Sequence, residues 1–239
     1  MHRPYIIAIE GNIGAGKTTI IKAFSSKSQF LNTKEEYICI TEPVSRWEMI
    51  RDTKTNENIL SNFYQNPSKY SFPFQIMAFI TRKQQIQEEI NKIKEMKRAH
   101  HQPTIITERS LMADKQVFAK MLYDDNMIED IMYQIYNLNY DDPELPLADA
   151  IIYLKATPTN CLTRVNKRNR EGETNISLEY LQKCETYYEE WLFKEPKPIL
   201  VLDVNTVIEK EHYTKIEEFI NSLDKTRFAT KEQVGFLPK

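Results

Sequence analysis

Short apolar runs alternate with longer amphipathic stretches along this chain of 239 residues. Five of the apolar runs have the length of buried strands and are bounded by polar or turn-forming residues. Strands separated by helices predict an α/β fold with a mostly parallel five-stranded sheet, flanked by helices and joined by right-handed crossovers. We expect the strands over residues 5–9, 37–40, 104–107, 149–155 and 199–202.

The segments between these runs carry apolar residues at helical spacing. In the longest segment, 72–98, Ser71 is the expected N-cap. Gln75, Ala78 and Arg82 lie three and four residues apart, so they share one face of this helix. The apolar stripe on another face contains Phe72, Ile76, Phe79, Ile86, Ile90 and Ile93. The other predicted helices cover 18–24, 44–51, 56–65, 111–123, 127–138, a segment that begins at Pro158, 177–191 and 210–224.

A glycine-rich segment joins the first predicted strand to the first predicted helix. It holds three of the five glycines of the chain and matches the phosphate-binding pattern G-x-x-x-x-G-K-[ST]. Glycines let successive backbone N–H groups converge on phosphate oxygens, and the helix presents its N-terminus to the same phosphates. In this pattern the lysine reaches the β- and γ-phosphates, and the hydroxyl holds Mg²⁺. The residues are Gly11, Asn12, Ile13, Gly14, Ala15, Gly16, Lys17 and Thr18.

Charged residues follow two other predicted strands. Glu42 comes after the strand at 37–40, and Glu108 and Arg109 come after the strand at 104–107. Ligands of parallel α/β sheets bind outside the carboxyl ends of the strands. We therefore expect these three side chains to share one cleft with the glycine-rich segment.

The composition narrows the class of protein. Length and a hydrophobic content of 41% fit one α/β domain over residues 1–224, followed by a polar tail at 225–239. A net charge of −2 gives no nucleic-acid signature, and no apolar stretch approaches the ~20 residues of a membrane span. The first strand begins too early to leave room for a targeting segment, and three widely spaced cysteines indicate reduced thiols. These features predict a cytoplasmic protein that binds neither nucleic acid nor a membrane.

Six short motifs make a family resemblance visible. They lie at 11–19, at 42–44 with Trp47, and at 72–75, 108–110, 153–158 and 178–181. Together they resemble the deoxynucleoside kinase family, which includes deoxycytidine kinase, deoxyguanosine kinase and the insect deoxynucleoside kinase. The resemblance extends over about residues 5–224. It implies a homodimer that transfers the γ-phosphate of ATP, with Mg²⁺, to the 5′-hydroxyl of a deoxynucleoside for nucleotide salvage.

The resemblance assigns roles on the phosphate side of the cleft. Glu42 matches the family's general base, which removes the proton of the attacking hydroxyl. Arg109 and Lys17 match cations that stabilise the transferring phosphoryl group. Glu108 matches a carboxylate that holds Mg²⁺ together with Thr18. The other implied ATP contacts are Thr19, the arginines Arg164, Arg168 and Arg170 of a lid at about 163–175 that also contains Lys167, and the adenine loop of Asp203, Val204 and Asn205.

On the acceptor side, the resemblance implies that the Gln75 amide binds the edge of the base. Tyr64 and Glu173 match the pair that holds the sugar 3′-hydroxyl. Because Glu173 follows the lid arginines, lid closure and sugar recognition would be coupled. The apolar wall of the implied pocket comprises Trp47, Leu60, Phe63, Phe74 and Phe118.

Three further residues bear on the base. Ala78, Arg82 and Asp114 resemble the set in deoxycytidine and deoxyguanosine kinases. An arginine and an aspartate can form a charge-assisted pair across a pocket, and this pair would occupy the room that thymine needs for its methyl group. We therefore expect deoxyadenosine, deoxyguanosine or deoxycytidine to be used in preference to thymidine. The alternative is a surface salt bridge that has no bearing on specificity.

Other functions share some of these signals. A nucleoside monophosphate kinase of the thymidylate type also has a P-loop and an arginine lid, but its anionic acceptor needs cations rather than a base such as Glu42. A P-loop protein without kinase activity is the other alternative. As a GTPase switch it would need a D-x-x-G motif, which the sequence lacks. The basic run at 164–170 would then be a solvated helix face.

Overall fold

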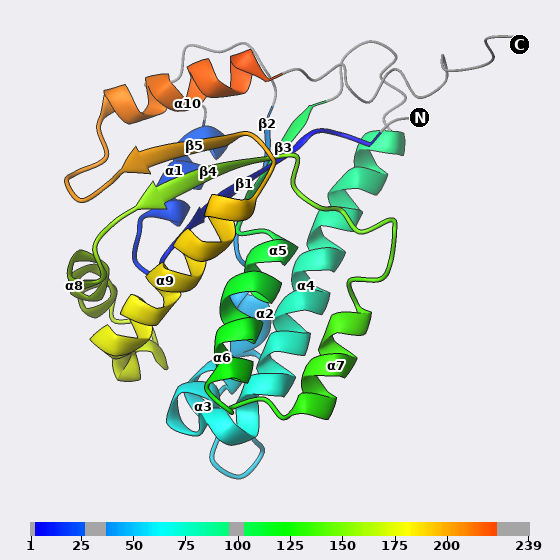
Figure 1. Ribbon diagram of the computed structural model, residues 1–239, viewed down its shortest axis with the longest axis vertical. Helices are drawn as coiled ribbons and strands as arrows, with labels where there is room; N and C mark the ends of the chain where they lie inside the picture. The colour runs from blue at the N-terminus through cyan, green and yellow to red at the C-terminus, as the bar shows by residue number, and fades with distance from the viewer. Residues whose placement is uncertain (1–2, 27–36, 96–102, 224–239) are drawn as a thin grey trace, which may run out of the picture.

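The computed structural model of the protein describes residues 3–26, 37–95 and 103–223. Within them, five strands form one sheet in the order β2-β3-β1-β4-β5, and every neighbouring pair is parallel (Figure 1). The predicted α/β class is confirmed, and each strand lies close to its predicted bounds. The strands are β1 (Ile6–Gly11), β2 (Tyr37–Ile40), β3 (Thr104–Glu108), β4 (Ala150–Lys155) and β5 (Ile199–Asp203).

Helices connect these strands and cover both faces of the sheet. They are α1 (Lys17–Ser25), α2 (Val44–Glu48), α3 (Ile59–Gln65), α4 (Pro67–Glu95), α5 (Leu111–Ala113), α6 (Lys120–Asp124), α7 (Asp130–Leu138), α8 (Pro158–Arg168), α9 (Leu178–Lys194) and α10 (Lys210–Ser222). A π-helical turn, η1 (Asp114–Ala119), joins α5 to α6, and a 3₁₀ turn, η2 (Glu173–Asn175), precedes α9. The helices α2 and α3 are shorter than predicted, because a bridge between Arg51 and Asn58 closes a loop between them.

Alternate residues of β1 face two separate cores. Ile7 and Ile9 pack in the core that α1 and α10 complete, whereas Ile6 and Ala8 pack in the core under α4. All four side chains are fully buried. The helix α9 covers β4 on the same face as α4 (Figure 1). Because helices cover both faces of the sheet, its strands are continuous apolar runs rather than alternating ones.

The longest helix differs from its prediction at the N-terminus. It begins at Pro67, so Ser71 is buried inside α4 and is not its N-cap. Proline is favourable at the first helical position, because its missing N–H has no intrahelical partner there. The second proline, Pro73, obscured this start in the sequence because it interrupts a helical pattern. The predicted end beyond Glu95 and the predicted tail at 225–239 lie outside the described residues.

The strand order brings the predicted polar residues to one edge of the sheet. Ile9 of β1 is paired with Glu108 of β3, so the glycine-rich segment and Glu108 leave the sheet side by side. Because β2 pairs with the other side of β3, the chain after Ile40 brings Glu42 to the same edge. This edge is the carboxyl end of the parallel strands, where α/β folds bind ligands.

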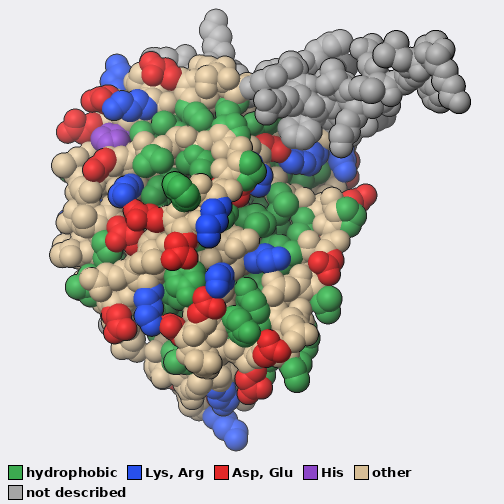
Figure 2. Space-filling model, in the orientation of Figure 1, with side chains coloured by type: hydrophobic (Ala, Val, Ile, Leu, Met, Phe, Trp, Pro, Cys, Tyr) green, Lys and Arg blue, Asp and Glu red, His purple; other side chains and the backbone are tan. Residues whose placement is uncertain are grey.

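The surface carries charges of both signs. On the described part of the face shown in Figure 2, acidic and basic side chains are interspersed and form no continuous basic patch. This distribution agrees with the net charge of −2. Among the described helices, none is both long and apolar enough to cross a membrane.

Candidate active site

The glycine-rich segment forms a tight loop between β1 and α1. Gly14 has φ +83°, and a Cβ atom there would lie 2.5 Å from the carbonyl oxygen of Cys161. Gly16, with φ +101°, directly precedes the first residue of α1. Residues with side chains rarely adopt this left-handed backbone. The loop therefore depends on its glycines, and it presents the N-terminus of α1 to the cleft.

Lys17 is held by the loop itself. Its Nζ atom donates hydrogen bonds to the carbonyl oxygens of Gly11, at 3.1 Å, and Asn12, at 2.8 Å. The residue is only 4% exposed. Burial, reinforced by repulsion from Arg109, lowers the pKa of Lys17 to about 8 even though Glu108 and Glu42 attract its charge. A phosphate at this loop would favour the charged form.

Thr18 and Glu108 form a pair beside the loop. The Thr18 hydroxyl donates to Oε1 of Glu108 at 2.8 Å, and the backbone N–H of Glu42 donates to Oε2 at 3.4 Å. A hydroxyl and one carboxylate fit Mg²⁺, which is usually bound by one or two protein groups together with phosphate oxygens and water. Among the described residues, no group of three or more acidic, histidine or cysteine side chains is placed to hold a metal ion by itself. In proteins, Mg²⁺ that is bound by one or two side chains takes its other ligands from phosphates and water.

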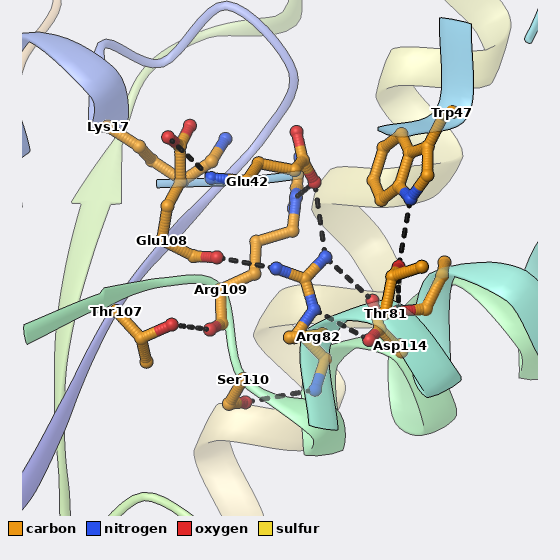
Figure 3. Close-up of polar contacts among 12 residues, drawn as sticks. Lys17, Glu42, Trp47, Thr81, Arg82, Thr107, Glu108, Arg109, Ser110 and Asp114 are labelled. Carbon is orange, nitrogen blue, oxygen red and sulfur yellow. Dashed lines mark hydrogen bonds and ion pairs between the residues drawn. The ribbon is translucent and has the colours of Figure 1, made fainter. Parts of the chain in front are cut away.

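Glu42 lies between two arginines (Figure 3). Its Oε1 atom is 3.2 Å from the terminal nitrogen of Arg82 and 3.3 Å from Nε of Arg109. Burial alone would raise the pKa of Glu42, but attraction to Arg109, Arg82 and Lys17 outweighs it and lowers the pKa to about 2. Its side chain keeps 18% exposure. Glu42 is therefore ionised at neutral pH and accessible from the cleft.

Arg109 has the left-handed backbone that side chains rarely adopt, with φ +66°. Its guanidinium donates to the carbonyl oxygen of Gly11 at 3.1 Å and lies 4.5 Å above the centre of the Phe118 ring. The residue is 4% exposed. A cation is thus fixed between the phosphate-binding loop and the wall of the pocket.

Arg82 and Asp114 form a buried pair rather than a surface salt bridge. The Arg82 Nε atom lies 2.8 Å from Asp114, and a terminal nitrogen donates to the carbonyl oxygen of Glu108 at 2.6 Å (Figure 3). Arg82 is 1% exposed and Asp114 is 3% exposed. The π-helical turn η1 begins at Asp114 and turns both this carboxylate and Phe118 toward the cleft. Such turns occur often at functional sites.

The predicted acceptor residues converge on one pocket that is partly open to solvent. The Phe63 and Phe74 rings stack with centroids 4.7 Å apart, and Trp47 meets Phe74 edge-on at 5.4 Å. Gln75 is 2% exposed and also borders this pocket. All the acceptor residues expected from the sequence border it: Glu42, Trp47, Leu60, Phe63, Tyr64, Phe74, Gln75, Ala78, Arg82, Arg109, Asp114, Phe118 and Glu173.

Two of the predicted lid arginines are paired with the predicted sugar ligand. Arg168 donates to Oε2 of Glu173 at 2.5 Å, and Arg170 donates to Oε1 at 3.0 Å. All three side chains border the pocket, together with Tyr64. Both oxygens of the Glu173 carboxylate are therefore engaged by the lid.

Arg164 is placed differently from the other lid arginines. One terminal nitrogen donates to the carbonyl oxygens of Val204 at 2.6 Å, Asn205 at 3.3 Å and Thr206 at 3.2 Å. Arg164 is not among the residues that border the acceptor pocket, and its contact with the ATP phosphates stays a prediction. Its guanidinium instead holds the loop after β5, where Asp203 and Val204 were expected to contact adenine.

Three polar residues of this region received no role from the sequence, although Tyr180 lies in the motif at 178–181. Tyr180 borders the pocket, with its ring 6.0 Å from that of Tyr64. Glu10 and Tyr188 lie behind Arg109 and are fully buried. Glu10 directly precedes the glycine-rich segment, and a charged residue at the end of an apolar strand was the available signal. Tyr188 gave no such signal, because an aromatic residue on a helix is usually a core residue.

Comparisons with known proteins agree with this geometry. The model of the deoxynucleoside kinase family matches residues 7–226. The chain is 32% identical to mouse deoxycytidine kinase over 247 aligned residues, which cover 91% of each protein. It is 29% identical to the mitochondrial deoxyguanosine kinase of Xenopus laevis, over 91% of this chain and 90% of that protein. A probable deoxycytidine kinase of fowlpox virus is 33% identical over 83% of this chain and 77% of its own length.

Proposed function

Because the chain belongs to the deoxynucleoside kinase family, we propose that it transfers the γ-phosphate of ATP to the 5′-hydroxyl of deoxyadenosine, deoxyguanosine or deoxycytidine in preference to thymidine. The protein is a phosphotransferase with a nucleotide as phosphate donor and a deoxynucleoside as acceptor. The observation that carries the proposed transfer to a 5′-hydroxyl is the position of Glu42. This ionised carboxylate borders both the phosphate-binding loop and the aromatic pocket.

Glu42 supplies the base that a hydroxyl acceptor needs. A hydroxyl becomes an effective nucleophile as its proton is transferred to a positioned acceptor. A carboxylate with a pKa of about 2 is a weak base. When phosphate oxygens share the charge of Lys17 and Arg109, less of that charge acts on Glu42, and the basicity of Glu42 rises.

The residues of the phosphate side each stabilise one part of the transfer. Lys17 and Arg109 neutralise charge on the phosphoryl oxygens, and the backbone of the glycine-rich loop donates hydrogen bonds to the donor. Thr18 and Glu108 would hold Mg²⁺, which would offset the negative charge of the phosphates. The 2.8 Å hydrogen bond between these two side chains supports this assignment.

The buried Arg82–Asp114 pair supports the proposed base preference. The pair borders the pocket beside Gln75 and Ala78, and burial of both ions fixes it in place. Purine and cytosine bases offer hydrogen-bonding groups that Gln75 and this pair can meet. Thymine adds a methyl group at a position that the pair would crowd.

Tyr64 and Glu173 are proposed to bind the 3′-hydroxyl of the sugar. Both border the pocket, on the side of the lid. Glu173 is bonded to Arg168 and Arg170, so a donor that attracts these arginines would free its carboxylate for the sugar. Donor and acceptor binding would then support each other.

A homodimer is also part of the proposal. The helices α4 and α7 lie side by side (Figure 1) and leave large apolar side chains exposed. Hydrophobic side chains reach the surface on the side of the view where α7 lies (Figure 2). The exposed apolar side chains of this α4/α7 surface are Ile80, Ile131, Met132, Ile135 and Leu138.

Nucleotide salvage in the cytoplasm remains a prediction. One of the relatives described above is named as mitochondrial, so the family alone does not fix the compartment.

A nucleoside monophosphate kinase is the nearest competing function. Its acceptor would bring a phosphate beside Glu42 and Glu173, two carboxylates that border the acceptor side of the pocket. A phosphate acceptor is already an anionic nucleophile and needs no base, whereas a hydroxyl acceptor does. The position of Glu42 therefore favours a hydroxyl acceptor.

The test is an acceptor panel with purified protein, ATP and Mg²⁺. The acceptors are the four common deoxynucleosides, thymidine 5′-monophosphate and none, and 5′-phosphorylated products are separated by chromatography. We expect kcat/KM for thymidine to be at least about tenfold below the best of the other three deoxynucleosides. Faster phosphorylation of thymidine monophosphate than of any nucleoside would overturn the proposal, and thymidine as the best acceptor would overturn the base preference.

A further inference from the structure

The buried residues behind Arg109 form a hydrogen-bonded chain that the proposed function does not use. The Tyr188 hydroxyl of α9 donates to Oε2 of Glu10 at 3.1 Å and accepts a hydrogen bond from the Arg109 guanidinium. The other oxygen of Glu10 accepts a hydrogen bond from the backbone N–H of Ser110 at 2.8 Å. Glu10 and Tyr188 are fully buried, and neither borders the pocket.

This arrangement holds Arg109 at two points. The backbone next to Arg109 is bonded to Glu10, and the side chain of Arg109 is bonded to Tyr188, which Glu10 in turn orients. The backbone of Arg109 is left-handed, with φ +66°. For a residue with a side chain this conformation is unfavourable and persists only where the surroundings enforce it. Burial of an ionised carboxylate in the protein interior also costs free energy unless hydrogen bonds or an opposite charge compensate for it.

We propose that Glu10 and Tyr188 are positioning residues that aim the Arg109 guanidinium at the transferring phosphoryl group. They act through Arg109 and do not touch either substrate. The carboxylate fixes the turn from which Arg109 projects, and the phenol fixes the rotation of its guanidinium. Glu42 and Phe118 restrain the same guanidinium from the cleft side. The cation is therefore oriented before the phosphates arrive, which is how preorganised charges lower a reaction barrier.

The inference rests on the proposed role of Arg109 and makes a separate prediction. Loss of the Tyr188 hydroxyl leaves the lining of the pocket unchanged but removes the restraint on the Arg109 guanidinium from the interior side. A misplacement of about 1 Å at a reacting centre can cost on the order of 10²-fold in rate. We expect Tyr188→Phe to lower kcat by about tenfold or more while KM for the deoxynucleoside changes by less than about threefold. A structural defect alone would not produce this split.

Tyr153→Phe is the matched control. Tyr153 of β4 stacks on Tyr188, with ring centroids 5.7 Å apart, and it loses a hydroxyl from the same aromatic cluster. Its hydroxyl is not among the groups that hold Arg109 or Glu10 in the described part of the chain. This variant should keep kcat within about twofold when both variants are assayed well below their thermal midpoints.

The deciding measurement is a double-mutant cycle with Arg109→Lys. If Tyr188 acts through Arg109, its effect on kcat depends on the presence of the guanidinium. In the Arg109→Lys background, Tyr188→Phe should therefore lower kcat by less than about threefold. Equal losses in both backgrounds, or an equal loss in Tyr153→Phe, would overturn the inference. Full activity of Arg109→Lys would instead overturn the proposed role of Arg109 itself. An impaired Arg109→Lys beside a fully active Tyr188→Phe would overturn the positioning role alone.

Discussion

At the scale of single residues, the site is a compact set of paired charges. Arg82 links Asp114 to Glu42, and Arg109 reaches Glu42 from the other side. Removal of one partner from a buried pair leaves an uncompensated charge and costs about 3–5 kcal/mol. Substitutions in this set are therefore informative only when partners change together or when the replacement keeps the shape.

The Arg82–Asp114 pair provides the first prediction. The double variant Arg82→Met with Asp114→Ala opens space at the base without leaving a lone charge, so kcat/KM for thymidine relative to deoxycytidine should rise by about tenfold or more. The ratio is used because Arg82 also touches Glu42, and both rates will fall together. The matched control is Lys83→Met with Asp142→Ala, a partly exposed ion pair whose lysine directly follows Arg82 in α4. An unchanged ratio in the first variant would show that the pair does not exclude thymidine.

Lys17 provides a prediction about pH. Its pKa is lowered to about 8, so it loses its charge as pH rises past that value, well before an exposed lysine would. As pH rises from about 8 toward 10.5, Lys17 should increase the free energy of unfolding. In this range the unfolded state still binds the proton that the folded state has lost. ATP affinity should fall over the same range, since the cation that meets its phosphates is lost.

Isothermal titration of ATP from about pH 7 to about pH 9.5 measures this dependence. Lys17→Arg serves as the control, because an arginine stays charged throughout the range. The same pH dependence in both proteins would contradict the assignment to Lys17.

At the scale of elements, the lid divides into two parts. Arg168 and Arg170 bond to Glu173 at the acceptor pocket, whereas Arg164 of α8 bonds to the loop after β5. Three carbonyl oxygens of that loop share one guanidinium nitrogen. Hydrogen bonds that involve a charged group contribute about 1.5–3 kcal/mol each when buried, and less where solvent reaches them.

We expect Arg164→Met to raise KM for ATP by about tenfold while KM for the deoxynucleoside stays within about twofold. The reason is that Arg164 shapes the loop at the donor base and does not reach the acceptor. Lys167→Met is the control, since Lys167 is an exposed cation on the same helix. Initial rates over a grid of both substrates give the two constants. A rise in the acceptor KM alone would contradict this role.

The elements predicted best from the sequence are those that depend on residues close together in the chain. The glycine-rich loop, the strands and the polar residues after them follow from pattern and spacing alone. The predicted start of α4 was wrong because Pro73 interrupts a helical pattern, although the helix continues through it. The next residue, Phe74, packs against Phe63 of α3 and Trp47 of α2. The π-helical turn at Asp114 was missed, since nothing in the sequence distinguishes it from an ordinary helix. Tyr188 was missed because its partners lie far away in the sequence, at Glu10 and Arg109.

At the scale of the whole molecule, the α4/α7 surface is the feature that the single chain leaves unexplained. Ile131 is 70% exposed and Leu138 is 66% exposed. Ile131, Ile135 and Leu138 lie four and three residues apart, so they share one face of α7. Contiguous apolar surface of this kind favours association with another protein surface, and a second copy is the partner that the family resemblance implies.

Ile131→Glu with Ile135→Glu should convert a dimer into a monomer in sedimentation velocity runs, because it places charges in the apolar centre of the proposed interface. Phe193→Glu is the matched control, since Phe193 is 91% exposed on α9 and lies outside the α4/α7 surface. That variant should remain dimeric. A monomeric unmutated protein, or a monomer produced by Phe193→Glu alone, would contradict this interface.

The proposed phosphate transfer depends most on Glu42, the carboxylate between the phosphate-binding loop and the acceptor pocket. Glu42→Gln keeps the size of the side chain and an oxygen that Arg82 can bond, but it removes the base. The measurement is kcat with the best deoxynucleoside, together with the Kd for ATP by titration on the same preparation. We predict that kcat falls by about 10²–10⁴-fold while the Kd for ATP changes by less than about threefold. Turnover close to that of the unmutated enzyme would contradict the proposal that Glu42 activates the 5′-hydroxyl.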